Sequence, residues 1–149
     1  MQIADVRAAI AAAAATVALP PKAGRLVATG YVPDSVTEPA FFIADVEVEY
    51  DKTMGRGLDA LQLTCRVLVG RQDDQRAQAV LDAMLSGAGP ASLKAAIEAA
   101  RGAPGEAALG GLAHDLHIER VQAYRWYEHQ GTEYVGAEIV IRVIGRGDS

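Results

Sequence analysis

The stretch ADVEVEYDKTMGRGLDALQLTCRVLVG, residues 44–70, decides the fold. From Ala44 to Asp51, apolar side chains alternate with acidic ones. From Leu61 to Val69, apolar side chains alternate with Gln, Thr and Arg before leucine fills position 68. A period of two is typical of strands that bury one face and expose the other. The stretch therefore predicts an antiparallel hairpin of two half-buried strands.

Apolar positions matched across this hairpin set its register. They give three facing pairs: Tyr50–Leu61, Val48–Leu63 and Val46–Cys65. The same register places Asp45 opposite Arg66, an opposite-charge pair that contributes about 0.2–1 kcal/mol. Because a slip of one residue would turn one apolar set to solvent, we expect the register to be well specified.

The loop between these strands is long, with about eight residues where two to five are usual. Its lysine precedes its glycines, and a strand follows it, whereas a phosphate-binding loop needs a helix N-terminus directly after the glycines. A nucleotide site is therefore not expected here. We interpret the tip, formed by Lys52, Thr53, Met54 and Arg56, as a contact with another protein; a solvated loop is the alternative.

The acidic side chains Asp45, Glu47, Glu49 and Asp51 form a row on one strand face. This acidic row has three interpretations: a solvated sheet face, a wall that repels DNA phosphates, or a contact with arginines of a neighbouring subunit. In the third case, Arg120, Arg125 or Arg142 would lie within salt-bridge reach. We expect Asp45, Glu47 and Glu49 to face a channel, because in the predicted register only Arg66 is close.

The first 101 residues predict helices on either side of this hairpin. Apolar residues at spacings of three and four indicate a helix over 3–17, which Pro20 and Pro21 end. A short strand over 25–32 follows. A second helix runs from Ala77 to Leu85, and a third begins with Pro90 in its first turn.

The last third predicts a second hairpin. Strands over 115–127 and 132–144 are rich in β-branched and aromatic residues, and a change of phase near Glu119 indicates a β-bulge. We expect a mobile loop over 102–111 and a frayed tail over 145–149. The order of elements predicts one α+β domain over 1–149, an antiparallel sheet built from hairpins with helices on one face.

Composition excludes several classes of function. The net charge of −5 argues against broad binding to duplex DNA or to an anionic membrane, and no apolar run approaches the 18 or so residues that span a bilayer. His114 and His117 would point to opposite faces of a strand, and Cys65 lies on an apolar face. We expect no catalytic, cofactor or metal site, and hence no enzyme.

Five phrases carry a resemblance to a known family. In chain order they are ADVRAAIAAAAA, YVPDSVTEPA, VEVEYDKTMGRGLDALQLTCRVLVGR, DDQRAQAVLDAMLSG and GTEYVGAEIVIRV. Their order and spacing, over nearly the whole length, resemble the tail terminator proteins of long-tailed bacteriophages, especially those of actinobacteria. The family has no catalytic signature.

The resemblance implies a structural virion protein, made in the cytoplasm of the host bacterium and placed at the tail–neck junction. It implies a homohexameric ring that caps the tube of major tail tube protein, stops its polymerisation and offers a docking surface to the head–tail connector. DNA would pass without specific binding, and no enzymatic activity, cofactor or membrane is implied. The alternatives are a neck or head-completion protein of the same virion, and a small α+β enzyme or ligand-binding domain.

Overall fold

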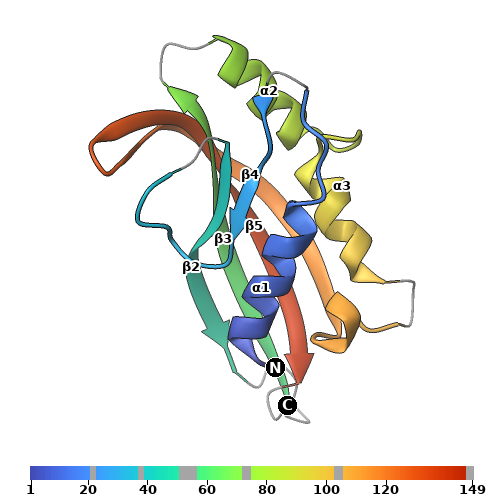
Figure 1. Cartoon of the computed structure of the whole chain (residues 1–149). Helices are drawn as coiled ribbons and strands as arrows, with labels where there is room; N and C mark the ends of the chain where they lie inside the picture. The colour runs from blue at the N-terminus through green and yellow to red at the C-terminus, as the bar shows by residue number, and fades with distance from the viewer. Residues whose placement is uncertain (21–22, 37–38, 51–56, 72–74, 103–105, 147–149) are drawn as a thin grey trace.

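The computed structural model describes residues 1–20, 23–36, 39–50, 57–71, 75–102 and 106–146. The predicted fold class is confirmed: a single α+β domain with helices packed against one sheet (Figure 1). The helices are α1 (Ile3–Ala14), α2 (Gln75–Leu85) and α3 (Leu93–Glu98), with 3-10 turns η2 (Ala99–Arg101) and η3 (Leu109–Gly111). The strands are β1 (Val27–Thr29), β2 (Ala40–Glu49), β3 (Leu58–Arg71), β4 (Asp115–His129) and β5 (Thr132–Arg146).

The five strands form one sheet in the order β1-β2-β3-β5-β4. Three of its four pairings are antiparallel, as predicted, but β1 runs parallel to β2, so the sheet is mixed. β1 is also shorter than the predicted strand over 25–32. No described helix is long and apolar enough to cross a bilayer.

The β2–β3 register differs from the prediction by two residues. Val48 faces Leu61, and Val46 faces Leu63. β2 begins at Ala40, four residues earlier than predicted, because residues 40–43 are buried and apolar throughout and show no alternation. A bulge between Ile43 and Asp45 then restores the phase. Since a shift of two preserves the faces, the predicted inward and outward sides of residues 46–49 hold although their partners do not.

The main core lies between the sheet and the helices. Each helix contributes buried side chains at helical spacing: Val6, Ile10 and Ala14 from α1, Ala77, Leu81 and Met84 from α2, and Leu93 and Ile97 from α3. Ser92 caps α3, since its hydroxyl accepts a hydrogen bond of 3.1 Å from the Ala95 N–H. The prediction that Pro90 occupies the first turn of this helix was therefore wrong.

The C-terminal hairpin is longer than predicted. Its turn holds only Gln130 and Gly131, with φ angles of 53° and 80°, the left-handed pair that tight hairpins require. The bulge expected near Glu119 is present, and a second bulge lies between Gln122 and Arg125. β5 continues to Arg146, so the predicted frayed tail was wrong for residues 145 and 146; residues 147–149 lie outside the described chain.

The predicted loop over 102–111 is partly anchored. It contains η3, and Ala108 and Leu109 are buried in the main core. An isolated bridge joins Ala108 to Ala113. Mobility of this segment remains a prediction, and residues 103–105 lie outside the described part.

A second, smaller core lies on the face of the sheet that the helices leave open. It contains Phe42, Leu68, Tyr127 and Tyr134. The tip of the β4–β5 hairpin bends away from the sheet (Figure 1), and the His129 Nε2 atom lies 2.9 Å from the Pro33 carbonyl oxygen. This cluster fixes the bent hairpin against β2 and β3.

Candidate interaction surfaces

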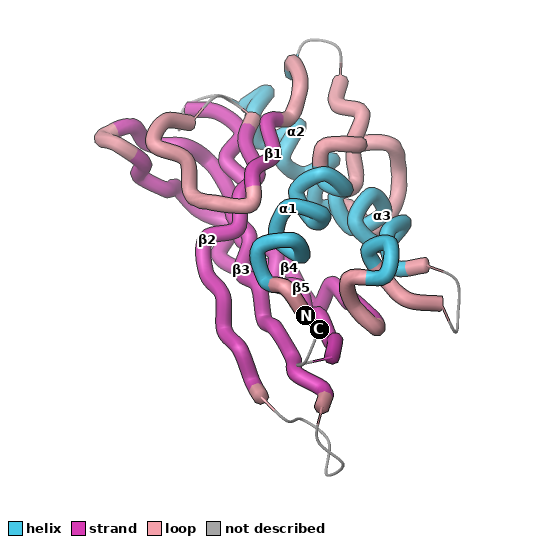
Figure 2. The backbone as a smooth tube through the Cα atoms, turned by 60° about the horizontal axis from the view of Figure 1, so that its bottom comes forward, coloured by secondary structure: helices cyan, strands magenta, loops and turns pink. Residues whose placement is uncertain are grey.

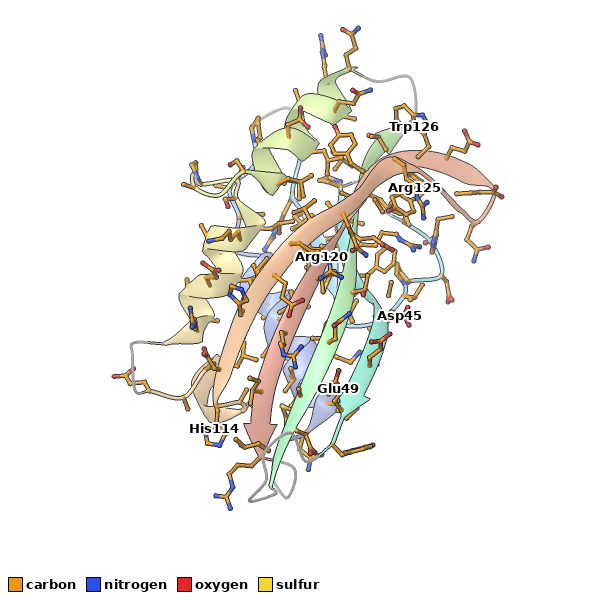
Figure 3. The ribbon with its side chains drawn as sticks, turned by 180° about the vertical axis from the view of Figure 1, so that it is seen from behind. Asp45, Glu49, His114, Arg120, Arg125 and Trp126 are labelled. Carbon is orange, nitrogen blue, oxygen red and sulfur yellow. The ribbon has the colours of Figure 1, made fainter. Side chains whose placement is uncertain are left out.

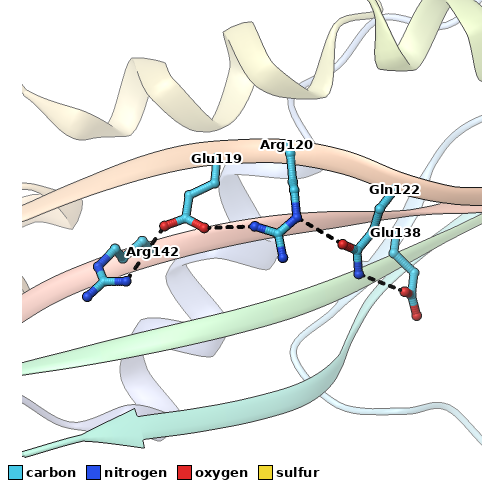
Figure 4. A network of polar contacts seen from close by, with 5 residues as sticks. All are labelled: Glu119, Arg120, Gln122, Glu138 and Arg142. Atoms are coloured by element: carbon cyan, nitrogen blue, oxygen red, sulfur yellow. Dashed lines mark hydrogen bonds and ion pairs between the residues drawn. The ribbon is translucent and has the colours of Figure 1, made fainter.

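The helix-free face of the sheet carries a chain of polar contacts across β4 and β5 (Figure 4). Arg142 lies 3.7 Å from Glu119, whose other carboxylate oxygen lies 3.2 Å from Arg120. The chain continues in two hydrogen bonds: Arg120 donates to Gln122 at 2.9 Å, and Gln122 donates to Glu138 at 3.3 Å. These contacts link the exposed outer strand β4 to the interior of the sheet.

The inner end of this network is partly buried. Arg66 donates to Glu138 at 3.1 Å, and their side chains are 29% and 14% exposed. The Arg66 guanidinium also lies 4.6 Å from the centre of the Tyr127 ring, a cation–π arrangement. Burial, and then the nearby Glu138 carboxylate, raise the pKa of the Tyr127 hydroxyl. Arg66 therefore joins the small core to the polar network.

Asp45, Glu47 and Glu49 of the acidic row lie on the same helix-free face, along β2, and Figure 3 labels Asp45 and Glu49; Asp51 lies outside the described residues. Asp45 faces Thr64 and not Arg66, and Arg66 is bonded to Glu138 instead. The expectation that only Arg66 is near the row was wrong, because Arg142 lies 3.9 Å from Glu49. Within the described chain, no cation lies at ion-pair distance from Asp45 or Glu47. The orientation of the row toward a channel remains a prediction.

The outer strand β4 exposes an apolar row that sequence reasoning missed. Val121, Tyr124 and Trp126 are each 40–45% exposed. The Tyr124 hydroxyl donates to the Asp82 carboxylate of α2 at 2.9 Å, and partial burial followed by this contact raises its pKa. A shallow hollow beside Val121 is lined mainly by apolar side chains of α2, β4 and β5. Three large apolar residues within six positions of a polar strand are the signal that indicates this surface.

The loop tip of Lys52, Thr53, Met54 and Arg56 lies outside the described residues, so its role as a protein contact remains a prediction. The strands that carry it project at one end of the sheet (Figure 2).

The residues considered as metal ligands or catalytic groups lie apart from one another. His117 is exposed on β4 opposite Arg142, while His114 precedes β4 and donates its backbone N–H to Ile144. Cys65 is buried in the main core, and burial raises the pKa of its thiol. Among the residues described, no group of three or more His, Cys, Asp and Glu side chains is arranged to hold a metal ion.

No protein-family model matches the chain, and no curated protein matches it. The described surface carries an acidic row on β2, an outer strand β4 with exposed arginine and apolar side chains, and a polar network across β4 and β5.

Proposed function

We propose that this chain is a ring-forming structural subunit of the tail terminator type. Six copies form a closed ring on the last ring of a bacteriophage tail tube, stop its polymerisation and present a surface to the head–tail connector. DNA passes through the ring without specific binding.

The observation that carries the proposal is a sheet with two different open edges. β1 pairs with only Ala40–Phe42 of β2, and β4 is the outermost strand on the other side. An unpaired strand edge offers N–H and C=O groups that a strand of another chain can bind. Subunits that join through two different surfaces make head-to-tail contacts, and these contacts close into a ring when the rotation from one copy to the next divides the full circle.

The sequence resemblance supplies the kind of assembly. The five phrases that resemble tail terminators cover the first hairpin, most of strand β5 of the second hairpin, and helices α1 and α2. The proposed partners are further copies of the chain, the major tail tube protein and the connector or neck protein, at the tail–neck junction of the virion. The loop of residues 52–56 is assigned to the contact with tube protein or with an adjacent subunit.

Native mass measurement and electron microscopy test the proposal. The 15.6 kDa chain, alone or mixed with tail tube protein, should give a species with six copies, and a reconstruction of the neck should show six-fold symmetry at this layer. Any other symmetry there contradicts the hexamer. A chain that stays monomeric with tube protein and is absent from virions contradicts the whole proposal.

A further inference from the structure

We infer that β2 of one copy pairs with β4 of the next, so that acidic side chains of one subunit meet Arg120 of its neighbour. This inference rests on the proposed ring and names the surfaces that build it. It adopts the subunit-contact interpretation of the acidic row in place of the channel interpretation. The partner is a second copy of the same chain.

Both edges are accessible in the described chain. Beyond Phe42, the outer side of β2 pairs with no described strand, and neither does the outer side of the 15-residue strand β4. Figure 2 shows the lower half of β2 standing clear of β1. Each edge therefore keeps backbone groups that a strand can pair with.

The strand directions suit the pairing. β2, β3, β5 and β4 are antiparallel in succession, so β2 and β4 run in opposite directions. A ring axis along the strands leaves these directions unchanged from copy to copy. β4 then meets the next β2 as an antiparallel pair, and the helix-free faces of both copies stay on the same side.

The positions of the charged residues along the two strands also fit this pairing. Asp45 faces Thr64, Thr64 faces Val140, and Val140 faces Arg120. By these pairings, Asp45 and Arg120 lie at the same level along the strands, Asp45 on β2 and Arg120 on β4. An unshifted contact sets Asp45 beside Arg120 of the next copy, and a shift of two residues brings Glu47 there instead.

Charge complementarity favours this partner over others. Asp45 and Glu47 have no cation at ion-pair distance in the described chain, so a neighbouring copy can supply one. The Arg120 side chain is 51% exposed, and of its five N–H groups only part is used by Glu119 and Gln122. Arg125 is exposed on the same face. Pairing gives the acids a cation and gives the arginine a second carboxylate.

The opposite face of the same contact is apolar. Val46 and Val48 of β2 pack partly buried against the main core. Val121 of β4 lies on that helix side, because its partner Ile139 belongs to the core. Tyr124, bonded to α2, lies there too. In this register a neighbouring β2 would cover Val121 on the helix side, while an acidic side chain reaches Arg120 on the other side.

Disulfide trapping tests the pairing. The full-length double variants Asp45→Cys/Arg120→Cys and Glu47→Cys/Arg120→Cys are oxidised and run on a non-reducing gel. At least one should give a ladder that ends at six copies. Within one copy the two positions are three strand spacings apart, about 14 Å, too far for an internal disulfide. The native Cys65 is buried and does not interfere.

The single variants are the matched controls. A head-to-tail contact joins unlike positions, so neither Asp45→Cys nor Arg120→Cys alone should cross-link, while their mixture should stop at dimers. Asp45→Cys paired with Glu106→Cys, an exposed site on neither edge, should stay monomeric. The absence of a ladder in both double variants overturns the pairing, and cross-linking of a single variant overturns its head-to-tail form.

The outcomes separate this inference from the proposed function. A six-copy species without a ladder overturns only the edge pairing, because the ring then uses other surfaces. A ladder with a different end point supports the pairing and contradicts the hexamer. The absence of both contradicts both.

Discussion

Replacement of Gly136 by alanine should destabilise the fold strongly. A Cβ atom at this position would lie 2.8 Å from the Leu68 Cδ2 atom and 3.1 Å from the Tyr127 Cδ2 atom, and closer still to the Val67 carbonyl oxygen. That oxygen belongs to the backbone of β3, so no side-chain rotation relieves the contact. β3 and β5 would have to separate locally by about 1 Å to reach van der Waals distance.

The magnitude follows from what that separation breaks. Leu68 faces Gly136 in the ladder, and loss of about two backbone hydrogen bonds there costs about 1–3 kcal/mol. Overpacking of the small core around Tyr127 costs about 1–3 kcal/mol more. We expect the free energy of unfolding to fall by about 2–6 kcal/mol, and the melting temperature by about 5–20 °C.

Urea unfolding followed by circular dichroism at one protein concentration measures the change. Gly87→Ala is the matched control, because a Cβ there meets no atom within 4 Å and its φ angle is not left-handed. We expect that control to change stability by less than about 1 kcal/mol. If Gly136→Ala unfolds within about 0.5 kcal/mol of the wild type at an unchanged slope, the close approach of β5 to β3 is refuted.

Three further predictions concern single side chains. Cys65 should not react with a thiol reagent at pH 8 until the chain is unfolded in denaturant, and native-state labelling would contradict its burial. The Arg101 hydrogen bond lowers the pKa of Asp115, so this pair stabilises the fold above the ordinary pKa of about 3.9 and loses its effect as the pH falls further. Asp115→Asn should therefore be less stable than the wild type at pH 7, and the difference in urea titrations should shrink as the pH falls through the lowered pKa of Asp115. Arg66→Ala should cost about 1–3 kcal/mol, because it strips Glu138 of its cation, and a neutral result in thermal unfolding would contradict that contact.

The sequence predicted the parts of the fold that depend on local pattern. The alternation after Ala44 gave the correct inward and outward faces of β2, and the phase change near Glu119 located a real bulge. Helical spacing identified the buried side of α2. These predictions were correct because each depends only on the spacing of apolar residues along the chain.

What failed depends on contacts between distant segments. Phe41 packs in the main core and Phe42 in the small core, so a strand buried on both faces shows no alternation and its start was missed. That earlier start, with its bulge, moved the register by two residues. The small core was not predictable, since it forms only when the bent β4–β5 hairpin brings Tyr127 over β3. The apolar row of Tyr124 and Trp126 became recognisable once β4 proved to be an outer strand.

The bulges in β2 and β4 have a consequence for the selectivity of strand pairing. β2 is bulged at Ala44, and β4 is bulged twice, beside Glu119 and at Ala123. A straight, flat edge accepts almost any extended peptide and grows into fibres, whereas a kinked edge accepts only a strand with a matching bend. The shape of the edges would thus select the partner strand in addition to their charge. Two open edges alone would allow polymerisation without end, and the bulges restrict each edge to partners of matching curvature. The rotation between successive copies is then fixed, and a fixed rotation that closes gives a finite ring instead of a filament.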